Sequence, residues 1–451
     1  MVEDYFDHIY IIGVVIITVL MFIVTHLLYK ESNEVQAKLI TQNVGSTDAF
    51  QRVRISNPFT LGDYKHVYGD NPDMLNHIVN GGTIVHNPNE SSVKLSVTDT
   101  IGSRAVHQSK MYHHYMPGKS QLIMSTIVLK QTCKGVSKKT GYFDDKDGIY
   151  FEEDENGILN FAMRSSVTGE AKERVIKQTD WNGDRLNGKG NSNWAIDITK
   201  TQLSWFDMQW LGVGRVRCGF VHEDEYVLCH TFYNSDILDK VFMSNPNLPL
   251  RCEIENISSN RSCNFDQICG TVISEGGYSE AGRDFSVVSD TVNLVPPPGN
   301  NSSNVIGILL KNSFKNRQNR MFIRLLDVGV FSEGSDVKYE VIKVNGDGTT
   351  ASITGTTPTS VNDESGVQYI DDCTIETSST QEVIQTGFVQ SSTEKKNTIS
   401  SYNSSSPSDA KKNFISQNFS STFSDAFVVK VTELKGTSTD VTVTMTWREI
   451  Y

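Results

Sequence analysis

Three aspartates fall within one short segment, FDDKDG, which contains Asp144, Asp145 and Asp147. Carboxylate oxygens are preferred ligands of Ca²⁺, so the segment has the residue types of a calcium loop. The full spacing of an EF-hand loop is missing, and Asp-Gly is also the sequence that a tight β-hairpin turn requires. We therefore expect a hairpin turn here, with a structural Ca²⁺ as the alternative.

Two other groupings could support chemistry. His113 and His114 are adjacent in MYHHYMPG, but no Cys or carboxylate stands near them in the sequence, so we expect a solvated turn rather than a metal site. The acids of 152–155 could serve a glycoside hydrolase, but neighbouring residues on a strand point to opposite faces. Trp205 and Trp210 could stack on sugars, although burial inside a sandwich is the commoner role.

Sequence motifs of catalysis are absent from the chain. There is no P-loop, no G-x-S-x-G, no H-E-x-x-H and no C-x-x-C. We expect a protein that is not an enzyme and holds no cofactor, apart from the possible Ca²⁺.

The chain has 7 cysteines, and an odd number in a long chain favours reduced thiols over a disulfide scaffold. One pair is an exception. RVRCGFV and EYVLCHTF predict a hairpin, and if Val221 pairs with Tyr226, Cys218 lies directly opposite Cys229. The two could form a disulfide in an oxidising compartment, or simply touch as small apolar residues.

An apolar run near the N-terminus predicts a membrane segment. Residues 9–29 contain no Asp, Glu, Lys or Arg, and a helix of that length would span a hydrocarbon core of about 30 Å. No basic n-region or cleavage site accompanies it, so we expect an uncleaved single-pass anchor in the lipid bilayer, with the body on the cytoplasmic side. The predicted anchor residues are Ile9, Tyr10, Ile11, Leu20, Phe22, Leu28 and Tyr29.

These side chains need a scaffold, and the rest of the chain predicts a mainly β protein. Short β-type runs are bounded by Gly, Asn and Pro, as in β-sandwiches. The run PPPGNNSS indicates a linker. The predicted organisation is an acidic tail (1–8), a transmembrane helix (9–29), a short stalk (30–45), a main β-sandwich (46–285), a linker (286–304) and a smaller β-sandwich (305–451). A net charge of −12 argues against nucleic acid as a partner.

Several segments, in order along the chain, resemble virion structural proteins of tailed marine and cyanobacterial phages and of large DNA viruses. They include STDAFQRVRISNPFTLGDYKHVYGDNP (46–72), QSKMYHHYMPGKSQLIMSTIVL (108–129), GYFDDKDGIYFEED (141–154), QTDWNGDRLNGKG (178–190), DMQWLGVGRVRCGFV (207–221) and ICGTVISEGGY (268–278). The resemblance implies a role in particle architecture and brings no catalytic residues with it. The predicted sandwich also resembles the concanavalin-type jelly roll of lectins, a likeness of fold alone.

Together these features predict a membrane-anchored viral structural protein, either a tether between capsid and membrane or a surface protein. The alternative is a carbohydrate-binding attachment protein on the same lectin-like sandwich. The expected location is a virion or host membrane, and the expected partners are other virion or capsid proteins, possibly glycans, and further copies of the chain.

Overall fold

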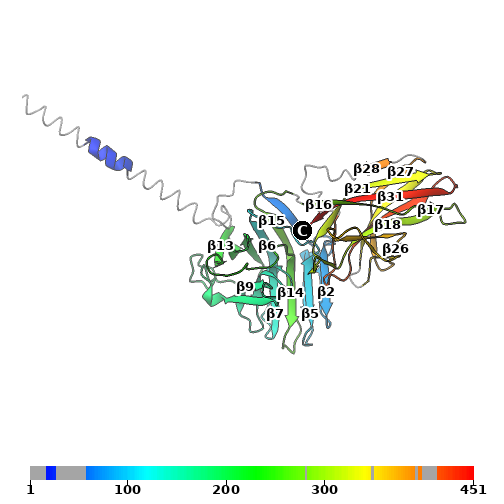
Figure 1. Cartoon of the computed structure of the whole chain (residues 1–451). Helices are drawn as coiled ribbons and strands as arrows, with labels where there is room; N and C mark the ends of the chain where they lie inside the picture. Colours follow the sequence, from blue (N-terminus) through cyan, green and yellow to red (C-terminus); the bar gives the residue numbers. More distant parts are fainter. Residues whose placement is uncertain (1–16, 27–56, 280–281, 347–349, 392–394, 399–413) are drawn as a thin grey trace, which may run out of the picture.

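The computed structural model describes residues 17–26, 57–279, 282–346, 350–391, 395–398 and 414–451 (Figure 1). They form two β-domains that follow one another along the chain. Both domains are built from antiparallel strands, as the sequence predicted.

The transmembrane helix predicted for 9–29 is wrong for the part of the chain that the structure describes. The helical residues described in this region are 17–26. None of the described helices is both long enough and apolar enough to cross a bilayer. Leu20 and Phe22 lie in this helix. Outside the described residues are Ile9, Tyr10, Ile11, Leu28 and Tyr29, together with the predicted tail (1–8) and stalk (30–45).

The first domain is a sandwich of two sheets. One sheet contains, in spatial order, β13 (Glu225–Phe232), β12 (Val216–His222), β11 (Gln202–Met208), β6 (Gln121–Val128), β15 (Cys263–Ser274), β4 (Ser92–Val97) and β3 (Thr83–Asn87), with β1 (Phe59–Lys65) paired to β15. The other contains β10 (Lys172–Lys177), β9 (Leu159–Ser165), β8 (Gly148–Glu153), β7 (Val136–Phe143), β14 (Leu250–Asn256), β5 (Arg104–Ser109) and β2 (Met74–Val79). Short 3-10 turns occur at η2 (Pro88–Glu90) and η3 (Gln178–Asp180).

Apolar side chains that alternate along these strands fill the space between the two sheets. Phe151 on β8 meets Phe220 on β12 edge to face, with 5.0 Å between the ring centres. Phe161 on β9 faces Phe206 on β11 in the same way at 6.0 Å. Because each pair joins one sheet to the other, a single hydrophobic core holds the sandwich together.

The second domain repeats this plan with shorter sheets. One sheet contains β16 (Arg283–Val288), β31 (Thr439–Ile450), β21 (Phe322–Glu333) and β28 (Lys395–Thr398), with β17 (Val292–Leu294) on β31 and β29 (Phe414–Ile415) on β21. The other contains β24 (Thr359–Ser360), β25 (Val367–Asp371), β18 (Ser302–Leu310), β30 (Ala426–Glu433), β22 (Val337–Asn345) and β27 (Thr380–Val389). A small hairpin, β19 (Ser313–Phe314) with β20 (Arg317–Gln318), and a two-stranded sheet, β23 (Ile353–Thr354) with β26 (Thr374–Ile375), complete it.

Strand β31 shows how the sequence pattern builds this domain. Val441, Val443 and Met445 alternate with Thr residues, and all three side chains are fully buried in the second core. One face of the strand is therefore apolar and fills the core, and the other carries the Thr residues.

The stretch 286–304, which the sequence predicted as a linker, differs from that expectation. It contains the end of β16, all of β17 and the start of β18, and β16 and β17 both pair with β31. The Pro-rich run is a turn between β17 and β18, in which Gly299 donates a backbone hydrogen bond to Pro296. The three prolines of this run cannot donate to a strand ladder, but proline is well suited to a turn between strands.

Candidate functional site

The two domains are packed against each other beside a cleft. Met111 of the first domain is buried with Phe322, Phe414 and Ile450 of the second, and we call these four residues the interdomain cluster. Nearby, the ring of His77 on β2 stacks on Phe419, with 4.1 Å between the ring centres. These contacts fix the relative position of the two walls of the cleft.

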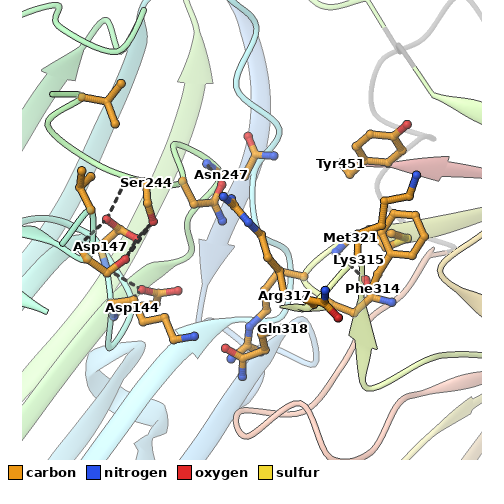
Figure 2. A pocket seen from close by; sticks show the side chains of 18 of the residues that line it. Asp144, Asp147, Ser244, Asn247, Phe314, Lys315, Arg317, Gln318, Met321 and Tyr451 are labelled. Atoms are coloured by element: carbon orange, nitrogen blue, oxygen red, sulfur yellow. Dashed lines mark hydrogen bonds between the residues drawn. The ribbon is translucent and has the colours of Figure 1, made fainter. Parts of the chain in front are cut away.

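The cleft has a volume of about 880 Å³ and is open to solvent. The first domain contributes the β7–β8 turn, the residues after β9 and the segment before β14. The second contributes the β19–β20 hairpin, Asn319 to Met321 and Tyr451. Figure 2 shows Asp144, Asp147 and Ser244 on one side of the cleft, and Phe314, Met321 and Tyr451 on the other.

The β7–β8 turn is rigid because Asp147 joins it to two other segments. Its carboxylate accepts hydrogen bonds from the backbone N–H and hydroxyl of Ser166 and from the backbone N–H and hydroxyl of Ser244, at 2.6 to 3.1 Å. Gly148 follows with φ +144°, and a Cβ added there would lie 2.1 Å from the Cβ of Phe143. The Asp-Gly pair therefore forms the predicted turn, and glycine is required at its second position.

The other two aspartates of the predicted calcium segment have their own partners. Asp144 accepts backbone hydrogen bonds from Lys146 and Asp147 at 2.8 and 2.9 Å, and burial raises the pKa of its carboxyl group. Asp145 forms ion pairs with Arg104 at 3.0 Å and Arg251 at 2.8 Å. Burial alone would raise the pKa of Asp145, but these two arginines lower it.

The calcium alternative is therefore not supported by the geometry of this segment. Asp144, Asp145 and Asp147 belong to one turn, but their carboxylates are held in three separate hydrogen-bond networks. Across the described ranges, side chains that could jointly hold a metal ion converge instead at His66, Asp70 and His107, elsewhere in the first domain.

The second wall presents an exposed hairpin. Lys315 and Asn316 have φ of +47° and +62°, the signature of a tight two-residue hairpin turn, and they place Phe314 opposite Arg317. Lys315 is paired with Glu364 at 2.8 Å. Within the described part of the chain, the side chains of Lys146 and Arg317 have no hydrogen-bond or ion-pair partner, so the cleft offers two available cations, one from each wall.

Aromatic and amide groups complete the lining. Tyr451 is 52% exposed at the cleft, and Phe314 is half-buried in the hairpin. The Asn247 side chain accepts a hydrogen bond from the backbone of Tyr115 at 2.8 Å, which holds its amide group at the cleft wall. A smaller pocket of about 230 Å³ shares Asp144, Lys146, Gln318 and Arg320 with the cleft and so extends it.

The four residues considered above for metal or sugar binding, His113, His114, Trp205 and Trp210, have structural roles instead. His113 is buried and contacts the Tyr64 hydroxyl at 2.9 Å, and Trp205 is buried with its indole N–H donated to the Phe220 carbonyl. Burial lowers the pKa of His114. Trp210 donates its indole N–H to Met243.

The acids of 152–155 are held apart from one another. Glu152 accepts a hydrogen bond from Ser137, whereas Glu153 is buried in an ion pair with Lys138 at 2.8 Å. Asp154 accepts backbone hydrogen bonds within its own turn, from Asn156 and Ile158. Neighbours on strand β8 thus point to opposite faces, as expected.

The predicted hairpin of Cys218 and Cys229 forms, but the cysteines are not opposite each other. Val221 does pair with Tyr226 as proposed. A β-bulge then shifts the register, so that Cys218 faces His230 and both thiols are free and buried. The disulfide of the structure joins Cys133 to Cys263, a pair that the sequence analysis did not single out.

Comparison with known proteins gives similar folds but no family. No protein-family model and no curated protein matches the chain. Among solved structures, the CBM2 module of the evolved Dit of Lactobacillus casei BL23 phage J-1 is 7% identical, with a TM-score of 0.34, over 49% of this chain and 98% of that one. A legume lectin-like domain from Entamoeba histolytica is 8% identical, with a TM-score of 0.27, over 44% and 89%.

A Bacteroides ovatus mixed-linkage glucan GH16 protein is 11% identical, with a TM-score of 0.32, over 47% of this chain and 99% of that one. These three similar structures are thus a CBM2 module, a legume lectin-like domain and a GH16 protein. These TM-scores are low, so we base the function of this chain on its own cleft.

Proposed function

We propose that the chain binds carbohydrate in the cleft between its two β-domains, and that the preferred glycan carries an acidic group. The observation that supports this proposal is the combination of Lys146 and Arg317, without partners, with the rings of Phe314 and Tyr451 in one open cleft. Aromatic rings bind the apolar faces of sugars, amides bind their hydroxyl groups, and cations bind a carboxylate or sulfate.

The cleft also favours binding over hydrolysis. Asp147 accepts hydrogen bonds from two serine hydroxyls and two backbone N–H groups, and Asp144 is held by its own turn. A hydrolase needs two carboxyl groups about 5 to 10 Å apart that can exchange protons with substrate and water. Carboxylates saturated by fixed donors serve the scaffold of the cleft instead.

A glycan array followed by calorimetry on the full chain tests the proposal. We expect signal on uronic acid-, sialic acid- or sulfate-bearing glycans, and a loss of about tenfold or more in affinity for Arg317→Gln and for Lys146→Gln, since each removes a charge-assisted contact. Lys177→Gln, an exposed strand residue away from the cleft, is the matched control. Binding that is unchanged in both cleft variants would place the glycan elsewhere, and no signal on any glycan would reject the proposal.

The resemblance of residues 46–278 to virion structural proteins supports a second proposal about context. We propose that the chain is a non-catalytic part of a virus particle, where its cleft contributes to attachment and other particle proteins are its neighbours. Quantitative mass spectrometry of purified particles tests this. The proposal requires a constant copy number per particle, and absence of the chain from particles would contradict it.

A further inference from the structure

A second cluster of side chains lies between the two sheets of the first domain, away from the cleft. His66 follows β1, which belongs to one sheet, and His107 lies on β5 of the other sheet. Asp70 lies in the loop between β1 and β2. One ligand atom from each residue lies within 4.8 Å of the others.

Both imidazoles are completely buried, and their polar atoms are incompletely satisfied. Relative exposure is 0% for His66 and for His107. Among the residues that the structure describes, neither nitrogen of His66 has a hydrogen-bond partner, nor does Nε2 of His107 or Oδ1 of Asp70. Buried polar atoms almost always have partners, so this concentration of unpartnered atoms at one point calls for a ligand between them.

The side chain of Asn76 determines which atoms face the cluster. Its Nδ2 donates to Asp70 Oδ2 at 2.6 Å, so its Oδ1 must accept, and it takes the hydrogen bond from His107 Nδ1 at 2.6 Å. A neutral His107 therefore carries its proton on Nδ1 and directs the lone pair of Nε2 toward Asp70 Oδ1, 3.5 Å away. Two acceptors facing each other across that distance repel unless a cation, either a metal ion or a second proton on His107, lies between them.

The arrangement matches the way proteins hold transition metals. A second-shell partner such as Asn76 commonly fixes the tautomer of a ligating histidine. In a tetrahedral site with ligands about 2.0 to 2.1 Å from the metal, neighbouring ligand atoms stand roughly 3.3 Å apart. The two imidazole-to-carboxylate distances, 3.5 Å from His107 and 3.7 Å from His66, are close to that value.

The side chain of Asp70 is 32% exposed, so the third ligand lies closer to solvent than the two buried imidazoles. Its Oδ1, the atom that faces both histidines, is itself buried.

We propose that His66, Asp70 and His107 bind one divalent first-row transition-metal ion, with Zn²⁺ as the representative, and that Asn76 orients two of the ligands. Two imidazoles and one carboxylate, with one coordination position left for water, form a ligand set suited to such ions. Since the histidines come from different sheets, the ion would join the two layers of the sandwich at their edge.

Metal titration of the full chain tests the proposal. After chelation and dialysis, Zn²⁺ is added during calorimetry, and Co²⁺ is followed by its visible absorption. We expect one tight site per chain, and an affinity at least about 100-fold lower in Asp70→Asn, since loss of even a second-shell partner costs 10- to 100-fold. Asp63→Asn, an exposed change of the same kind on β1, is the matched control and should bind as the unmodified chain does.

His107→Gln should likewise lose the site, with His222→Gln on the β12–β13 hairpin as its control. If His107→Gln does not fold, the partly exposed Asp70→Asn variant still decides the question. The proposal is overturned if the unmodified chain binds neither Zn²⁺ nor Co²⁺, or if Asp70→Asn and Asp63→Asn bind them equally. In that case the pair of His107 and Asp70 would be an ordinary buried ion pair.

Discussion

The guanidinium group of Arg320, from the second domain, lies 4.7 Å from the centre of the Tyr112 ring in the first. The same group donates hydrogen bonds to the carbonyls of Asn418 at 3.1 Å and Phe419 at 2.8 Å. Arg320 therefore links the loop that carries Phe419 to the first domain, next to the interdomain cluster. One side chain thus sets part of the geometry of the cleft.

Arg320→Gln should weaken the junction between the domains. The variant loses a cation–π contact and two charge-assisted hydrogen bonds, together worth about 2 kcal/mol of unfolding free energy. Urea denaturation followed by tryptophan fluorescence should show the two domains unfolding in more clearly separate steps. Arg317→Gln, on the exposed hairpin, should change stability by less than about 0.5 kcal/mol. Equal effects of the two variants would show that Arg320 does not couple the domains.

Glu253 should make the first domain sensitive to acid. Burial alone would raise the pKa of Glu253, but Arg251 and Arg104 hold it well below its usual range. A depressed carboxyl pKa stabilises the fold above the unfolded pKa of about 4.3, and this stabilisation is lost as pH falls below it. We expect the free energy of unfolding to decrease below about pH 4.5 in the unmodified chain and to vary less in Glu253→Gln.

At neutral pH, Glu253→Gln should itself cost about 3 kcal/mol, since it leaves the buried Arg251 without one of its counter-charges. Asp284→Asn breaks an exposed pair with Arg448 and is the control, with an expected cost below about 1 kcal/mol. A Glu253→Gln variant as stable as Asp284→Asn would contradict the stabilising role of the ion pair between Glu253 and Arg251.

The disulfide between Cys133 and Cys263 should contribute strongly to stability. It closes a loop of 130 residues, for which loop-closure entropy predicts about 5 kcal/mol. Replacing both cysteines by serine should lower the free energy of unfolding accordingly, whereas Cys269→Ser should have a small effect. Thiol titration in denaturant should count 5 free thiols before reduction and 7 after it. A count of 7 without reductant would show that the bond does not form.

Salt should distinguish the two kinds of contact in the cleft. If Lys146 and Arg317 bind an acidic group, affinity for the glycan should fall as ionic strength rises, because exposed charges are screened. The double variant Lys146→Gln, Arg317→Gln should lose most of this salt dependence. Phe314→Ala should weaken binding and leave the salt dependence intact. Calorimetry at two salt concentrations measures the affinity and its salt dependence for each variant. Salt-independent binding by the unmodified chain would contradict the role of the two cations.

Local features of this fold could be predicted from the sequence. Turn chemistry predicts the Asp147-Gly148 turn and the pairing of Val221 with Tyr226. Alternation along the strand predicts that Val441 faces inward. Both signals are properties of neighbouring residues. The Pro-rich run was interpreted as a linker because a turn and a linker share the same composition. The bulge beside Cys218 was not predicted, although Gly219 within the strand is a residue type that often marks one.

The binding features could not be predicted because they depend on distant segments. The cleft needs Lys146 of the first domain beside Arg317 of the second, and the metal cluster needs His66 beside His107. Only the short spacing from His66 to Asp70 in KHVYGDNP could have drawn attention to the cluster. The predicted helix of 9–29 rested on the apolar composition and length of one run, and none of the helices that the structure describes is long and apolar enough to cross a bilayer.

The interdomain cluster has a thermodynamic consequence for recognition. Met111, Phe322, Phe414 and Ile450 are buried together, so they hold the two cleft walls in place before a ligand arrives. A glycan entering the cleft would lose its own conformational freedom but would not have to order the protein. Association should therefore be a single fast step whose rate does not level off at high glycan concentration.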